Sequence, residues 1–283
     1  MGKKKKSDID TKKGSIGFDS YYSEIYGDRW SLLKTALLGE SVYAELKVQE
    51  KESYFLDPAS VIAALQLPVE NGKRFLDMCA APGGKTLVIA SRMEEDATLV
   101  SNERSASRKQ RLVQVCDNCL PESIRERIKI SCSDAAKWCT TQTECYDRIL
   151  LDAPCSSERH VLNDPKYLEE WSPNRIKTLA MEQWALLSCA YRLLEPDGYL
   201  LYSTCALAKA ENDGVVSRLF KKFDNAELVF QNREPVIPSG YESFIKMPQI
   251  PVPERTEFGF HILPDTQSGC GPIWFTLIHK KES

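Results

Sequence analysis

The sequence predicts an α/β protein in which helices cover both faces of a mostly parallel, doubly wound sheet, with a small N-terminal helical lobe and an antiparallel C-terminal hairpin. Three observations predict it. From residue 73 onward, short apolar runs with strand character alternate with longer amphipathic stretches, the pattern of consecutive βαβ units. The run at 149–151 is continuously apolar, which is typical of a strand buried on both faces. Residues 17–50 instead carry aromatic and apolar side chains at helical intervals.

The composition is that of an ordinary folded protein in a reducing compartment. Hydrophobic residues make up 42% of the chain and charged residues 27%, and 37 basic residues against 40 acidic ones give a net charge of −3. A partner with a phosphate backbone would therefore need a local concentration of basic groups. Ten cysteines without a signal-like apolar start indicate free thiols. No apolar run reaches the roughly 18 residues of a membrane span. We expect a cytoplasmic monomer, with an organellar location left open.

Three parts are predicted along the chain. Residues 1–16 form a Lys-rich tail that we expect to be flexible, residues 17–68 form the helical lobe, and residues 69–283 form the main α/β domain. The lobe is predicted from the spacing of Phe18, Tyr22, Ile25, Trp30, Leu33, Leu37 and Leu38.

Four strands and two helices make up the first half of the predicted sheet. The strands cover residues 74–79, 97–100, 128–132 and 147–151, and helices cover residues 87–93 and 105–119. A loop with adjacent glycines follows the first strand. Acidic side chains follow the other three, namely Glu103, Asp134 and Asp152.

The second half begins with a long helix, whose start is marked by Ser172 as a cap and Pro173 in the first turn. Gln183 interrupts the apolar stripe of this helix. A Pro- and Gly-containing turn at 195–198 follows. The remaining predicted elements are a fifth strand at 199–202, a helix at about 210–223, and an antiparallel pair of strands at 258–263 and 273–279.

Two thiols follow neighbouring predicted strands. Cys155 comes directly after the fourth strand and Cys205 after the fifth. If both strands lie in one parallel sheet, the thiols meet at its carboxyl edge, where open α/β sheets hold their ligands. Cysteine is well suited to add to an electron-poor ring carbon, because part of it is thiolate even at its ordinary pKa. The alternative for each is a small buried hydrophobe.

Three ligands compete for the glycine loop. The end of the loop, Gly84-Lys85-Thr86, fits a phosphate-binding P-loop, but Cys79 stands where the leading glycine is required. The dinucleotide pattern G-x-G-x-x-G is absent. An adenosyl ligand remains, because Glu103 at the next strand end could accept from both ribose hydroxyls. This arrangement suits S-adenosylmethionine, and a nucleoside triphosphatase remains an alternative.

Three ordered motifs resemble those of the Sun (Nol/Nop/Sun) family of S-adenosylmethionine-dependent RNA cytosine-5 methyltransferases. They are LDMCAAPGGKT at 76–86, DAPCS at 152–156 and YSTCA at 202–206 with Glu211-Asn212. Both ends of the chain are similar to the compact branch that acts on organellar rRNA and tRNA. The resemblance implies a Rossmann-like class I methyltransferase fold, with S-adenosylmethionine as cofactor and RNA as partner.

The resemblance also implies roles for individual residues. Cys205 is the nucleophile that adds to C6 of cytosine, Asp152 hydrogen-bonds the base near N3, and Cys155 assists release of the product. Glu103 stands where Asp is commoner. The cofactor positions are Cys79, Ala80, Ala81, Pro82, Gly83, Gly84, Lys85, Glu103, Arg108, Asp134 and Asp152.

The substrate cytosine must leave its stack, so we expect single-stranded or loop RNA, either rRNA or tRNA, selected with the help of a protein partner or through the structure of the RNA. Arg159 and His160 are candidates for contacting a phosphate. The lobe is a candidate for holding flanking nucleotides through Tyr21, Tyr22, Arg29, Trp30 and Lys34, or else a hydrophobic cap.

Two alternatives differ in class from this reading. The first is a non-catalytic RNA-binding or ribosome-assembly factor that retains the fold. The second is a zinc site, but its cysteines are irregularly spaced and two of them lie within a predicted helix, so we predict no metal. These cysteines are Cys116, Cys119, Cys132, Cys139 and Cys145.

Overall fold

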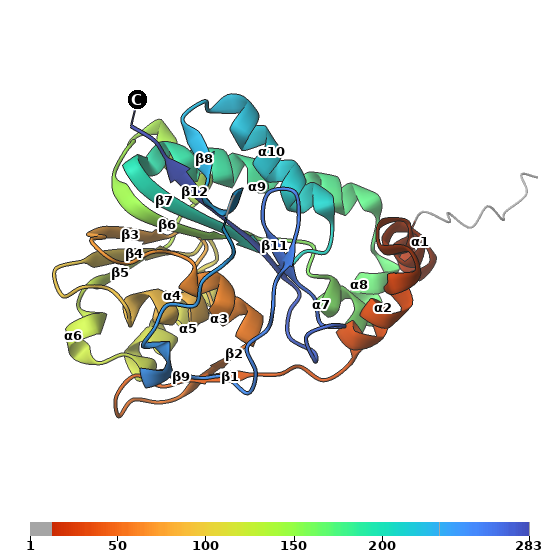
Figure 1. Ribbon diagram of the computed structural model, residues 1–283, viewed down its shortest axis with the longest axis horizontal. Coiled ribbons are helices and arrows are strands. Elements are labelled where there is room, and N and C mark those ends of the chain that lie inside the picture. Colours follow the sequence, from red (N-terminus) through yellow and green to blue (C-terminus); the bar gives the residue numbers. More distant parts are fainter. Residues whose placement is uncertain (1–12, 232, 283) are drawn as a thin grey trace, which may run out of the picture.

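A computed structural model describes residues 13–231 and 233–282, and in this part of the chain a nine-stranded mixed sheet forms the centre of the molecule (Figure 1). The path through the sheet is β10-β11-β12-β7-β6-β3-β4-β5, and β8 pairs with β12. The run from β7 to β5 is parallel, whereas β12, β11, β10 and β8 join antiparallel. The strands are β3 Arg74–Asp77, β4 Thr98–Asn102, β5 Ile128–Ser131, β6 Tyr146–Asp152, β7 Leu194–Thr204, β8 Ala226–Leu228, β10 Glu254–Arg255, β11 Phe260–Ile262 and β12 Ile273–Lys280.

Two hydrophobic layers, one on each face, hold helices against this sheet. Neighbouring strand residues point to opposite faces, so Phe75 and Leu150 join one layer while Leu76 and Ile149 join the other. The first layer includes α3 Pro58–Leu65, α4 Gly84–Ala90 and α5 Ala106–Cys119, and the second includes α9 Pro173–Leu193 and α10 Asp213–Lys222. The predicted doubly wound sheet and its antiparallel C-terminal pair are therefore confirmed.

The fifth strand differs from its prediction at its start. It begins at Leu194, so the predicted turn at 195–198 lies inside β7. Asp197 has a φ of 59°, and the β6–β7 pairing changes register between Tyr146 and Arg148. A left-handed residue in such an irregularity interrupts the ladder without ending the strand. The sequence pattern showed the turn residues but not that the flanking backbone keeps pairing.

The N-terminal region is only partly helical. It contains α1 Gly14–Tyr26, the 3₁₀ turn η1 Gly27–Arg29 and α2 Trp30–Leu38, and then the strands β1 Ala44–Leu46 and β2 Tyr54–Leu56. These strands form a second sheet with β9 Ile245–Lys246. The prediction of a helical lobe is therefore wrong for 44–56, because strands of three residues are too short to show alternation.

The predicted lobe also divides between two cores. Helices α1 and α2 pack with α7 Glu158–Asn163 and α8 Pro165–Glu169 at one end of the molecule, whereas β1, β2 and α3 pack against the first layer of the main sheet (Figure 1). Residues 1–12 of the predicted tail lie outside the described residues, and α1 already begins at Gly14. None of the described helices has the length and apolarity that crossing a membrane requires.

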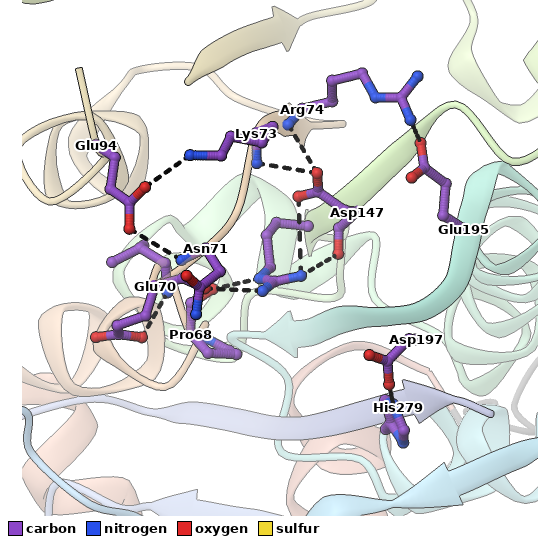
Figure 2. Close-up of polar contacts among 12 residues, drawn as sticks. Pro68, Glu70, Asn71, Lys73, Arg74, Glu94, Asp147, Glu195, Asp197 and His279 are labelled. Atoms are coloured by element: carbon purple, nitrogen blue, oxygen red, sulfur yellow. Dashed lines mark hydrogen bonds and ion pairs between the residues drawn. The ribbon is translucent and has the colours of Figure 1, made fainter. Parts of the chain in front are cut away.

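The amino ends of β3 and β6 are joined by polar contacts (Figure 2). Arg148 donates from Nε to the Pro68 carbonyl at 2.8 Å and from Nη2 to the Glu70 carbonyl at 3.0 Å. Asp147 accepts from the backbone N–H groups of Lys73 and Arg74. These bonds fix the loop that enters β3, and with it the register that places the carboxyl ends of the strands.

Candidate active site

The two thiols meet at the carboxyl edge of the sheet, as their positions predict. Strands β6 and β7 are parallel neighbours in which Asp152 pairs with Ser203, so the loops after them begin side by side. The sulfur atoms of Cys155 and Cys205 are 2.6 Å apart, and both are free thiols that are partly buried. Ser157 Oγ lies 3.5 Å from the first sulfur and 3.3 Å from the second.

The environment of Cys155 favours its protonated form. The hydrogen bond to Cys205 raises the pKa of Cys155 well above its ordinary value, and burial and the charge of Glu211 raise it further. Cys155 therefore keeps its proton at neutral pH, within hydrogen-bond distance of the sulfur of Cys205.

Asp152 is held by two neighbours at the end of β6. Lys85 Nζ lies 2.7 Å from Oδ2, and the Ser203 hydroxyl donates to Oδ1 at 2.8 Å. Burial alone would lower the pKa of Lys85. The charge of the Asp152 carboxylate and its hydrogen bond to Lys85 raise this pKa by more, so the pKa of Lys85 is raised. Lys85 stays charged and keeps the Asp152 carboxylate in place beside the thiols.

The glycine loop depends on backbone that a side chain would disturb. Gly83 has a φ of 122°, and a Cβ there would lie 3.0 Å from a methyl group of Val115. A Cβ on Gly84 would lie 2.9 Å from the ring of Tyr54. Arg108 anchors the loop from the other side, because its Nη2 donates to the Ala81 carbonyl at 2.6 Å. The loop therefore passes closely between α5 and β2.

Arg108 also links the loop to the acid after β4. Its Nη1 lies 3.1 Å from Oε2 of Glu103, whose Oε1 accepts from the backbone N–H of Ser105 at 2.8 Å. Asn102 joins the ends of β3 and β5, because its amide donates to the carbonyls of Met78 and Ser133. The carboxyl ends of β3, β4 and β5 are thus connected by hydrogen bonds, and Glu103 and Asp134 face one opening between them.

That opening is a cavity of about 380 Å³. A second cavity of about 120 Å³ shares Cys79 with it and reaches Lys85 and Asp152. The carboxylates of Glu103 and Asp134 are suited to accept from ribose hydroxyls and an adenine amino group, and apolar side chains are suited to the faces of the base. An adenosyl group therefore fits these hydrogen-bond acceptors and apolar side chains. Of the predicted cofactor residues, the two cavities are lined by Cys79, Ala80, Ala81, Pro82, Gly84, Lys85, Glu103, Arg108, Asp134 and Asp152.

The hydroxyl of Thr86 argues against a phosphate loop. In a P-loop this hydroxyl and the preceding lysine must face magnesium and phosphate. Here the Thr86 hydroxyl is buried and donates to Asp77 at 2.6 Å, and Lys85 is paired with Asp152. Burial raises the pKa of Asp77 to about 7. The two side chains that would bind a triphosphate are therefore turned to other partners.

Three buried residues behind the thiols were not predicted to belong to the site. Gln183 donates to the Pro154 carbonyl and to Glu211, at 2.8 Å in both cases. Glu211 also accepts from the backbone N–H of Ser156 at 3.0 Å. Glu158 is fully buried at the start of α7. A polar residue inside the apolar stripe of α9 was the signal for Gln183, whereas Glu158 gave none.

Most of the candidate nucleotide-binding side chains of the N-terminal region are buried or paired with carboxylates of this chain. Tyr22 and Trp30 are buried in the core that α1 and α2 share with α7 and α8. Arg29 is bound to Glu254 and Asp265 at 2.6 Å each, and Lys34 to Asp19 at 2.8 Å. Of the two alternatives for Tyr22 and Trp30, the hydrophobic cap therefore describes both residues. Tyr21 remains partly exposed.

The candidates for phosphate contact and for a zinc site have other neighbours than the two thiols among the contacts of the described residues. Arg159 donates to the Gly269 carbonyl at 2.9 Å, and His160 is exposed beside Tyr167. Cys116 and Cys119 are buried in α5. Across the described ranges no three His, Cys, Asp or Glu side chains gather as a metal site would require.

Comparison with known proteins identifies the family to which the chain belongs. The family model of the 16S rRNA methyltransferases RsmB/F matches residues 64–262. The 5-cytosine rRNA methyltransferase NSUN4 of Mus musculus is 30% identical over 234 residues, which cover 80% of this chain and 60% of that protein. The mitochondrial tRNA (cytosine(34)-C(5))-methyltransferase of Danio rerio is 35% identical over 180 residues, covering 63% and 48%. The chain thus spans about half to three fifths of these relatives.

Solved structures share the fold. A methyltransferase homologue from Pyrococcus horikoshii has a TM-score of 0.71 at 20% identity, with 94% of this chain and 95% of that chain covered. NSun6 from the same organism, solved with SFG, has a TM-score of 0.63 at 26% identity, covering 83% and 55%. The sheet and its helices therefore have the arrangement of a class I methyltransferase.

Proposed function

The chain belongs to the RsmB/F family of 16S rRNA methyltransferases, within the Sun family, and from this premise we propose that it methylates C5 of a cytosine in RNA. S-adenosylmethionine supplies the methyl group when it is bound. The names of the relatives include both rRNA and tRNA enzymes, so a cytosine in a single strand or loop of one of these RNAs is the proposed substrate. The cytoplasmic location and the monomeric state stay predictions.

The observation that carries this proposal is the pair of thiols at adjacent strand ends. A sulfur atom that adds to C6 of cytosine makes C5 electron-rich, and C5 can then accept a methyl group. Cys205 stands in the YSTCA motif, whose resemblance to the family assigns the attack to this cysteine, and Cys155 keeps its own proton 2.6 Å away. Cys205 is therefore the proposed nucleophile.

Cys155 and Asp152 have proposed roles around this attack. After C5 gives its proton to a water molecule, the C5–C6 double bond re-forms and the C6–S bond breaks, so that the sulfur leaves as a thiolate, which the thiol of Cys155 can stabilise by a hydrogen bond. Asp152 is fixed by Lys85 and Ser203, which leaves its carboxylate able to accept a hydrogen bond at the N3 side of the base. Cys155 and Asp152 can have these roles because the end of β6 lies beside the end of β7, which carries Cys205.

The cofactor proposal rests on the residues around the larger cavity. Glu103 and Asp134 line it as acceptors, and the glycine loop reaches from it to Asp152. The residues of the loop, with Lys85 and Asp152, would hold a methyl donor at this cavity. The residues of the site therefore hold donor and acceptor at one edge of the sheet.

Methyl transfer to RNA tests the proposal directly. The protein is incubated with rRNA or tRNA and S-adenosylmethionine carrying a labelled methyl group, and the RNA is digested to nucleosides. We expect the label in 5-methylcytidine, and no label with Cys205→Ala. Binding of RNA without any transfer would instead support the non-catalytic assembly factor, which has no chemical need for two thiols in contact.

A further inference from the structure

Two buried carboxyl groups lie directly behind the thiols and take no part in the proposed chemistry. Glu158 begins α7, and Glu211 ends the 3₁₀ turn η3 Lys209–Glu211 that follows the Cys205 loop. Neither side chain is exposed to solvent. Their hydrogen-bond donors in the described part of the chain are hydroxyl and amide groups. Carboxyl groups are costly to bury, so their presence needs a reason.

Glu158 bridges the two loops that carry the thiols. Its Oε1 accepts from the hydroxyl of Ser156, the residue after Cys155. Its Oε2 accepts from the backbone N–H of Leu207, two residues after Cys205, at 3.0 Å. A single carboxyl group therefore fixes the distance between the loops.

Helix α1 completes this bridge from the N-terminal region. The hydroxyl of Tyr22 donates to the same Oε1 of Glu158, and the hydroxyl of Tyr26 donates to the Leu207 carbonyl at 2.9 Å. The Tyr22 ring is itself fixed, because it stacks on Trp30 with centroids 5.2 Å apart. The position of α1 is thus transmitted to both loops through two hydroxyl groups.

Glu211 holds the Cys155 loop from the opposite side. It accepts from the Ser156 N–H, while Gln183 connects it to the Pro154 carbonyl. The loop is therefore held at the residues before and after Cys155. Glu211 thus links this loop to η3, whereas Glu158 links it to Leu207, the position nearer to Cys205.

We propose that Glu158 is a positioning residue that sets the contact between Cys155 and Cys205. The hydroxyl of Tyr22 holds the Glu158 carboxyl group in place by a hydrogen bond. The packing of α1 therefore controls the reactivity of the thiol pair. This inference rests on the proposed function. It gives the N-terminal helices a role other than RNA contact: they hold the catalytic loops in place from behind.

Tyr22→Phe tests the proposal, because it removes one hydroxyl and keeps the ring. We expect kcat for methyl transfer to fall about tenfold, in line with the loss of a hydrogen bond to a carboxylate, while KM for RNA and the affinity for S-adenosylmethionine stay within twofold. The matched control is Tyr191→Phe, since the buried hydroxyl of Tyr191 also donates to a side-chain oxygen, that of Asn225, at 2.9 Å. We expect this control to keep the wild-type kcat.

A conservative variant separates positioning from general damage. In Glu158→Gln the amide oxygen can accept from the Leu207 N–H while the NH₂ group donates to the hydroxyls of Tyr22 and Ser156. We expect Glu158→Gln to retain most of the kcat that Glu158→Ala loses. Equal loss in both variants, with circular dichroism showing both folded, would contradict a role in bridging the loops.

Alkylation of the thiols gives a readout that needs no substrate. Iodoacetamide labelling, located by peptide mass spectrometry, should be several-fold faster at Cys155 and Cys205 in Tyr22→Phe than in the wild type, because separated loops expose both thiols. A wild-type alkylation rate together with a wild-type kcat would overturn the inference. Faster alkylation in a protein whose wild type transfers no methyl group would support the positioning role and refute the proposed function.

Discussion

Glu211→Gln should remove a pH dependence from the stability of the fold. Burial, followed by the charge of Glu158, raises the pKa of Glu211 from 4.5 to about 7. The folded form therefore binds this proton more tightly than the unfolded form between these two values. The free energy of unfolding must then fall as the pH rises through this window, because the folded form has to ionise a buried carboxyl group.

The magnitude follows from the same shift. Since each pKa unit corresponds to about 1.4 kcal/mol, the wild type should lose about 3 kcal/mol through Glu211 between pH 4.5 and pH 8. Gln is neutral across the range and can still accept from the Ser156 N–H. The stability of the variant relative to the wild type should therefore rise by about 3 kcal/mol over that interval.

Urea unfolding at pH 4.5, 6 and 8, followed by far-ultraviolet circular dichroism, measures this difference. Asp77, whose pKa is also raised to about 7, contributes equally to both proteins and cancels. Glu126→Gln, at an exposed carboxylate, is the matched control and should follow the wild type at every pH. If the curves of Glu211→Gln and the wild type are parallel between pH 4.5 and 8, the reasoning about this buried carboxyl group is wrong.

Two further predictions concern the cofactor loop and the acid beside it. Glu103→Ala should weaken S-adenosylmethionine binding at least tenfold in calorimetry, because a ribose acceptor is lost; tight binding of ATP by the wild type would instead favour the triphosphatase. Gly83→Ala should lower the free energy of unfolding by about 1–3 kcal/mol, since φ is 122° and Val115 lies 3.0 Å from the added Cβ, whereas Gly39→Ala, with ordinary contacts, should cost less. Equal costs in urea unfolding would contradict the strain argument.

The main sheet could be predicted from the sequence because its central strands β6 and β7 are buried on both faces. Runs such as 149–151 leave little ambiguity, and the residue after each strand then falls at the carboxyl edge. The contact between Cys155 and Cys205 follows from this placement alone. The short strands β1 and β2 could not be found in the same way, because three residues give too little pattern.

The bridge behind the thiols could not be predicted, because it joins residues that are far apart in the sequence. Tyr22 and Glu158 are separated by 136 positions and meet only when α1 packs on α7. An aromatic residue on a helix has the same spacing whether its ring is buried or stacks on a base, and so Tyr22 and Trp30 were open to both interpretations. Tertiary packing decides between them.

The division of labour between the two thiols is the central claim. Cys155→Ala and Cys205→Ala should each be incubated with the RNA substrate and S-adenosylmethionine and then run on a denaturing gel. We predict that Cys155→Ala accumulates a covalent protein–RNA adduct, because Cys205 still attacks but release is impaired, and that Cys205→Ala forms none. An adduct in Cys205→Ala and none in Cys155→Ala would reverse the roles, and methylation that survives Cys205→Ala would contradict the mechanism.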